Sequence, residues 1–185
     1  MLETLTSERA ESVRAAVKRV ALTQLEAGGP PAVALNAIAR ELGVSGPALY
    51  RYFRNRDALL TELVLDAYND LAAALAAADS LVDAYRAWAL AQPHRYRLLF
   101  AAPLPGYDAH QPELVAAAQR SMELLLEVEP DRERAAVIWS RLHGFVSLEI
   151  EGNFASMGLD PEALFEGQRW QGDVATRASC SSTSG

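Results

Sequence analysis

Residues 35–60 read LNAIARELGVSGPALYRYFRNRDALL, and this stretch decides how the chain folds. Residues 35–42 have the spacing of a short helix, and Gly43 begins a tight turn because glycine readily adopts left-handed backbone angles. Ser45 is a suitable N-cap for a following helix over residues 46–53. Two short helices joined by such a turn predict a helix-turn-helix unit.

The pattern of these two helices separates a small core from an outward face. Ala39 is small where the helices must cross closely, and four apolar residues are spaced to form the core beside it. These four are Ile38, Leu42, Val44 and Leu49. The outward face of the second helix then presents six residues to a partner: Gly46, Pro47, Ala48, Tyr50, Arg51 and Tyr52.

The outward face has the chemistry of a surface that reads DNA. Tyrosine hydroxyls and a guanidinium bind phosphates or base edges, and small side chains let the backbone approach the major groove. Arg51 is the candidate base reader. The predicted DNA contacts are Arg40, Ser45, Gly46, Pro47, Ala48, Tyr50, Arg51, Tyr52 and Arg56. Two alternatives stay open: the tyrosines roof the small core, and the arginines form an ordinary solvated helix face.

Residues 42–60 closely resemble the DNA-binding domain of TetR-family transcriptional regulators, and the match covers the first four predicted helices. The resemblance implies a homodimer that binds a palindromic operator through the helix over residues 46–53, mostly as a repressor. It also implies a variable C-terminal domain that binds a small molecule and releases DNA. Two positions depart from the family's pattern. Ala34 stands where the family commonly has a Ser or Thr cap, and Arg56 replaces a lysine but keeps its charge.

Composition and charge are those of a globular chain with one basic patch. The 185 residues are 50% hydrophobic and 22% charged, and the single cysteine, Cys180, excludes a disulfide framework. No signal-peptide pattern or membrane-length apolar run is present, so we expect a cytoplasmic protein. The net charge of −7 arises after residue 66, because residues 1–66 carry eight basic and eight acidic side chains. Residues 40–56 hold four arginines against one glutamate.

Apolar spacings of three and four recur along the whole chain and predict an all-α fold of about nine helices. The helices are expected at residues 7–27, 35–42, 46–53, 55–79, 81–92, 93–101, 112–128, 131–157 and 161–170. Residues 1–55, completed by residues up to about 66, are the predicted helix-turn-helix DNA-binding domain. A ligand-binding and dimerisation domain is expected over residues 56–171, and a flexible polar tail over residues 172–185.

The helix expected over residues 131–157 is apolar over roughly 240° of its circumference, at about 100° per residue. So wide an arc must bury two sides, one against its own domain and one against a second copy of the chain. The helix over residues 161–170 would complete a four-helix interface, which predicts a homodimer. The predicted interface residues are Ile138, Leu142, Phe145, Leu148, Glu149, Leu164 and Phe165. Glu149 lies near the centre of the arc and requires a partner such as Arg141 or a ligand group.

Aromatic and soft side chains in the C-terminal part predict a pocket for an apolar or aromatic effector. Trp139, His143 and Gly144 resemble the Trp-His-Gly motif of one variant of the TetR C-terminal domain, where Gly144 would permit close helix approach. The predicted ligand contacts are Tyr85, Trp88, Tyr96, Phe100, Met122, Trp139 and His143. Each also fits a core role, and His143 fits a structural hydrogen bond, a ligand contact or a pH sensor.

Enzyme motifs do not accompany these features. The sequence contains no nucleophile elbow, P-loop, dinucleotide fingerprint or HExxH motif, so we expect neither catalysis nor a cofactor or bound metal. One rival function is a helical adaptor that uses the three-helix domain for protein contacts. The salt dependence of binding distinguishes the two functions, because operator affinity falls steeply as the salt concentration rises and the affinity of an apolar protein contact does not.

Overall fold

A computed structural model describes residues 2–100 and 105–168, with side chains from residue 10 onward. The described ranges contain ten α-helices and one short 3-10 helix, with no strand, which confirms the all-α prediction. No helix there is both long enough and apolar enough to cross a membrane. The tail predicted over residues 172–185 lies outside the described residues. The helices are α1 (Leu2–Gly28), η1 (Pro30–Ala32), α2 (Leu35–Glu41), α3 (Gly46–Tyr50), α4 (Arg56–Ala76), α5 (Leu81–Ala91), α6 (Pro93–Phe100), α7 (Pro112–Val128), α8 (Arg132–Ile150), α9 (Asn153–Ser156) and α10 (Pro161–Gly167).

The chain forms two compact units. The first comprises Met1–Ala67 and His94–Val115, and the second comprises Tyr68–Pro93 and Ala116–Gly185. Helix α4 is unbroken and contributes its first part to one unit and its last residues to the other. Helix α6 groups with the first unit, although the sequence pattern placed its residues in the C-terminal domain.

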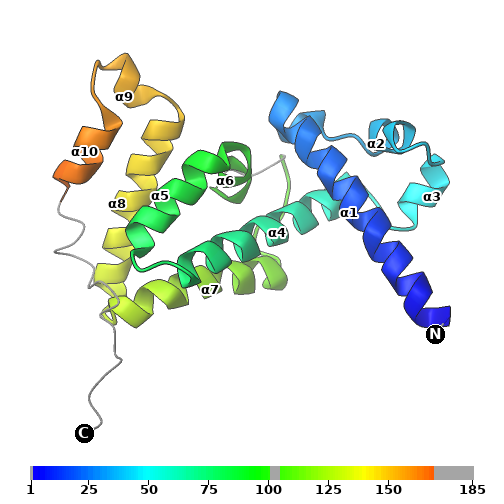
Figure 1. The fold of residues 1–185 in the computed structure, drawn as a ribbon, viewed down its shortest axis with the longest axis horizontal. Coiled ribbons are helices and arrows are strands. Elements are labelled where there is room, and N and C mark those ends of the chain that lie inside the picture. The colour runs from blue at the N-terminus through cyan, green and yellow to red at the C-terminus, as the bar shows by residue number, and fades with distance from the viewer. Residues whose placement is uncertain (1, 101–104, 169–185) are drawn as a thin grey trace, which may run out of the picture. The chain divides into compact units, whose positions relative to one another are not determined.

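In the first unit, α1, α2, α3 and the start of α4 lie next to one another (Figure 1). Each of them contributes buried apolar side chains to the core. Ala39 is buried, as its small size predicted. The largest side chains that are almost fully buried there are Val17, Leu25, Ile38, Leu49, Phe53, Leu59, Leu60 and Leu63. Val44, which the sequence pattern placed in this core, is 38% exposed. It lies in the turn beyond the end of α2, where no helix carries its side chain inward.

In the second unit, α5 and α8 lie side by side, and both bury one apolar face (Figure 1). The buried residues of α8 are Ala135, Ile138, Leu142, Phe145 and Val146. Those of α5 include Tyr85, Arg86 and Trp88, so polar groups reach into this interface as well.

The helix expected over residues 131–157 is divided at Gly152, and this accounts for the tenth helix. Helix α8 ends at Ile150, and Gly152 adopts a left-handed backbone with φ 71° and ψ 16°. Glycine takes this conformation without the steric cost of a Cβ, so it ends the hydrogen-bond ladder and lets α9 leave in another direction. The apolar arc predicted for one long helix is therefore shared between α8 and α9.

Candidate DNA-binding surface and ligand cluster

The turn between α2 and α3 is closed by backbone hydrogen bonds. Gly43 has φ 66°, its N–H donates to the Arg40 carbonyl at 3.2 Å, and the Val44 N–H donates to the Ala39 carbonyl at 2.9 Å. This pair of bonds is the Schellman arrangement, which ends a helix on a left-handed residue. The predicted role of Gly43 in the turn is confirmed.

The helices beside the turn begin on capping side chains. Ser45 Oγ accepts a hydrogen bond from the Ala48 N–H at 3.3 Å, and Asn55 Oδ1 accepts one from the Ala58 N–H at 2.8 Å. Ala34 has no capping side chain, as its identity implied. Gln24 of α1 instead holds the N-cap residue itself, because its Oε1 accepts from the Ala34 N–H at 3.0 Å. Sequence reasoning missed this contact.

Helix α3 and the turn after it separate buried from exposed residues sharply. Leu49 and Phe53 are each 1% exposed, whereas Tyr50 is 46% exposed and cannot roof the core. Tyr52 is half-buried, so the roofing alternative applies in part to that residue. Of the other predicted DNA contacts, Arg40, Ser45, Pro47 and Arg51 are exposed, and Gly46, Ala48 and Arg56 are half-buried.

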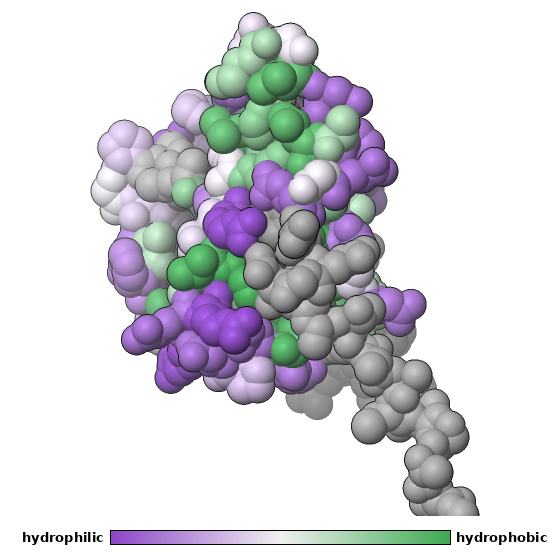
Figure 2. Space-filling view, turned by 90° about the vertical axis from the view of Figure 1, so that its left-hand side faces the viewer, coloured by the Kyte–Doolittle hydropathy of each residue, from purple (hydrophilic) through white to green (hydrophobic). Residues whose placement is uncertain are grey.

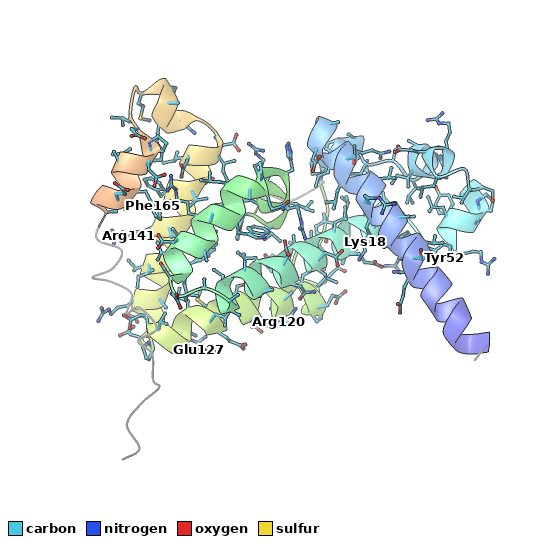
Figure 3. All side chains as sticks on the ribbon, in the orientation of Figure 1. Lys18, Tyr52, Arg120, Glu127, Arg141 and Phe165 are labelled. Carbon is cyan, nitrogen blue, oxygen red and sulfur yellow. The ribbon has the colours of Figure 1, made fainter. Side chains whose placement is uncertain are left out.

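An arginine of α1 supports the end of this surface. Arg14 Nη1 donates to the Tyr52 carbonyl at 2.9 Å, Nη2 pairs with the Glu62 carboxylate, and the guanidinium carbon lies 4.7 Å from the centre of the Phe53 ring. One turn along α1, Lys18 Nζ lies 2.7 Å from Asp66 Oδ2 (Figure 3). The sequence analysis missed these contacts, although basic residues four apart on α1 and acidic residues four apart on α4 were a usable signal.

Three of the predicted ligand residues meet in the second unit. The Tyr85 hydroxyl lies 3.3 Å from His143 Nδ1. The Trp139 and His143 rings are stacked, with their centres 5.3 Å apart and 14° between their planes. Trp88 donates through Nε1 to Asp70 Oδ2 at 3.0 Å. We call Tyr85, Trp139 and His143 the aromatic cluster. In the described ranges no group of three or more potential metal ligands is positioned to hold an ion.

The remaining predicted ligand residues are distributed differently. Tyr96 and Phe100 contact each other in α6, with ring centres 4.9 Å apart, and belong to the first unit. Met122 is half-buried on α7 in the second unit. Among the described residues, Gly144 does not mediate a close helix approach, because a Cβ there would meet nothing within 4 Å.

Burial lowers the pKa of His143 below its ordinary value. The folded protein therefore binds this proton less tightly than the unfolded chain. The resulting stability is complete above the unfolded pKa of about 6.5 and decreases as pH falls through it.

Between pH 7 and pH 5, we expect wild type to lose more free energy of unfolding than His143→Gln does, as measured by urea titration. His110→Gln is the control, because the His110 side chain is 93% exposed, and it should follow wild type. A His143→Gln profile parallel to wild type would contradict the prediction.

The buried carboxylate of Glu149 pairs with α5. Arg86 Nε and Nη2 donate to the two Glu149 oxygens at 2.9 and 2.7 Å, and Nη2 also lies 2.9 Å from Glu162 Oε2 of α10. Hydrogen bonding to Glu149 raises the pKa of Arg86, and hydrogen bonding to Arg86 lowers the pKa of Glu162. The prediction of Arg141 as partner was wrong, because eight residues along a helix correspond to about 12 Å of axial rise.

The predicted dimer residues fall into two groups. Ile138, Leu142, Phe145 and Phe165 are buried within the chain, and the Phe145 ring lies 4.8 Å from Phe154 and 5.5 Å from Phe165 (Figure 3). Leu148 is 43% exposed and Leu164 is half-buried. Val137, which was not predicted, is 55% exposed on the same helix.

Fold and site together define a helix-turn-helix DNA-binding regulator with a second helical unit. The family model described as bacterial regulatory proteins, tetR family, matches residues 19–63, and the one described as tetracyclin repressor-like, C-terminal domain, matches residues 78–168. The chain belongs to the TetR family of transcriptional regulators. Members of this family act by binding DNA, which supports the regulator over the enzyme and adaptor alternatives.

Relatives and solved structures agree with this assignment. HTH-type transcriptional regulator Rv1816 of Mycobacterium tuberculosis is 31% identical over 209 residues, covering 85% of this chain and 89% of the relative. A crystal structure of SCO4313, described as a regulatory protein, is 39% identical with a TM-score of 0.80, covering 86% of this chain and 94% of that one. A protein of unknown function from Rhodococcus sp. RHA1 is 26% identical with a TM-score of 0.73, at the same coverage.

Proposed function

We propose that this TetR-family regulator is a ligand-responsive repressor that acts in the cytoplasm and binds a palindromic operator as a homodimer. The observation that carries the proposal is that buried core residues and exposed polar residues occur side by side in α3 and the turn after it. Leu49 and Phe53 are buried in the core, while Tyr50, the last residue of α3, and Arg51, its C-cap, are exposed. An exposed guanidinium beside an exposed tyrosine is suited to binding phosphates and base edges in a major groove.

An exposed stripe along α8 supports the homodimer. Val137, Arg141, Gly144 and Leu148 are spaced by four, three and four residues and so share one helix face. Val137 and Leu148 are exposed, and a Cβ on Gly144 would meet open space. Figure 2 shows further apolar surface gathered over α9 and the adjoining segment, where Met157 and Leu159 are exposed. Helices of a second copy are suited to cover this stripe.

The aromatic cluster supports an effector site in the second unit. Its stacked rings offer an apolar surface, and the Tyr85 and His143 pair offers hydrogen-bonding groups, which suits an aromatic effector with one polar substituent. Helix α4 is the proposed lever between the effector site and α3. Its Glu62 pairs with Arg14 in the first unit, and its Asp70 accepts from Trp88 in the second.

The test begins with selection of bound duplexes from random DNA by the wild-type chain. We expect a palindromic winner whose affinity falls steeply with salt, because phosphate binding releases counterions. The winner then serves to screen effectors by release of the DNA. Recovery of highly charged effectors alone would contradict the proposed aromatic class, and no enriched duplex at low salt would contradict the proposed function.

Arg51→Ala tests the assignment of the base reader on that operator. We expect discrimination against base changes to fall by about 1–3 kcal/mol at the contacted position, since a base contact is lost. Arg54→Ala is the matched control, because it removes the same charge from an exposed residue outside the predicted contact set. It should weaken all duplexes alike in equilibrium titrations. Equal loss of discrimination in both variants would show that Arg51 is not the base reader.

A further inference from the structure

The recognition helix α3 spans only Gly46–Tyr50, which is too short to hold its own conformation. The Tyr52 and Phe53 N–H groups both return to the Leu49 carbonyl, at 2.9 and 3.1 Å. The Tyr52 carbonyl therefore lies just beyond this closing turn. This carbonyl accepts a hydrogen bond from Arg14. The bond therefore fixes the backbone immediately after α3.

Arg14 contacts this end of α3 in three ways. One guanidinium nitrogen donates to the Tyr52 carbonyl, another pairs with Glu62 of α4, and the guanidinium plane covers the buried Phe53 ring. A planar fork with several donors makes such contacts at the same time, whereas a lysine ammonium does not. Arg14 thus joins three segments of the first unit at a point directly after Tyr50 and Arg51.

Its neighbour Lys18 makes a different set of contacts. Lys18 also lies on α1 and also pairs with α4, at 2.7 Å from Asp66 and 3.9 Å from Glu62. The contacts found for Lys18 are with α4, and none is with Tyr52 or Phe53. The two residues therefore have the same charge on the same helix and differ in their connection to α3.

We propose that Arg14 is a positioning residue for DNA reading, which fixes the end of α3, and with it Tyr50 and Arg51, against Glu62 of α4. The inference rests on the proposed function of α3 as the reading helix. In this proposal Arg14 acts through its internal contacts with Tyr52 and Glu62, which use two of its five N–H donors. A direct phosphate contact through the other donors would show as a lowered salt slope of operator binding.

The experiment compares Arg14→Met with Lys18→Met on the selected operator at a temperature well below both unfolding midpoints. We expect Arg14→Met to lose about tenfold or more in operator affinity, as for a lost hydrogen bond from a charged group. Lys18→Met should stay within about threefold of wild type, because the Lys18 ion pair is partly solvated and does not reach the end of α3. The slope of affinity against salt should match wild type in both variants, because neither residue neutralises a phosphate in this proposal.

Several results would overturn the inference. Equal affinity losses in the two methionine variants would overturn it, and so would a salt slope lowered by about one unit in Arg14→Met, the mark of a direct phosphate contact. Arg14→Lys keeps the charge without the fork and should lose affinity nearly as far as Arg14→Met, so full affinity in this variant would also overturn the proposal. If wild type selects no duplex, the proposed function fails and the inference fails with it.

Discussion

Replacing Arg86 with methionine should lower the free energy of unfolding of the second unit by about 3–5 kcal/mol, the usual cost of breaking a buried ion pair. The Glu149 side chain is 8% exposed and receives two hydrogen bonds from Arg86. Removing Arg86 leaves that carboxylate buried without these donors. The change also removes the guanidinium that lies 4.4 Å from the Phe165 ring centre, and with it one link to α10.

Two variants separate the buried pair from its exposed neighbour in urea unfolding followed by circular dichroism. Glu162→Gln should have a small effect, because the Glu162 side chain is 62% exposed and the Arg86 to Glu149 contact stays in place. Arg86→Met with Glu149→Leu should recover most of the lost stability, because an apolar pair has no charge left to desolvate. A loss below about 1 kcal/mol in Arg86→Met would show that the pair is not a buried one in solution.

Leu148→Glu should separate the proposed dimer and lower operator affinity by about 100-fold or more, since each monomer then binds its half-site without the avidity of the pair. Leu148 is 43% exposed in the single chain, so the substitution should leave the stability of the monomer nearly unchanged. In the proposed dimer, a glutamate there would bury a charge within the apolar stripe, one turn from Gly144. Light scattering after size exclusion measures the mass, and titration of the operator measures the affinity.

Ala136→Glu is the matched control for Leu148→Glu. Ala136 is exposed on the same helix, about 120° around the axis from Leu148 at 100° per residue. The control adds the same charge outside the stripe and should remain dimeric with operator affinity close to wild type. If the Leu148→Glu variant remains dimeric, the dimer interface does not lie on this face of α8.

The local features of the fold were predictable because their causes are close together in sequence. Gly43, Ser45 and Asn55 act on backbone groups within five residues of their own positions, and the structure confirms all three roles. The exposed position of Arg51 followed in the same way from the helical period. Capping and turn chemistry are thus readable from one short stretch.

Contacts between distant helices were not predictable from the same pattern. Arg86 and Glu149 are 63 residues apart, and Arg14 and Tyr52 are 38 residues apart. Their meeting depends on how each helix is rotated and shifted along its neighbour, which periodicity within one helix does not specify. Gly152 was missed for a related reason, because a single glycine inside an apolar helical pattern is compatible with either continuation or a left-handed end.

The separation of buried and exposed residues in α3 has a consequence for how this regulator diverges. Tyr50 and Arg51 contribute little to the core that Leu49 and Phe53 maintain. Substitutions at the two exposed positions therefore carry little cost in folding, so the operator preference that we propose these residues set can change while the fold persists. Paralogues that share this scaffold are expected to differ first at these two positions, and an engineer seeking a new operator would randomise them before any other.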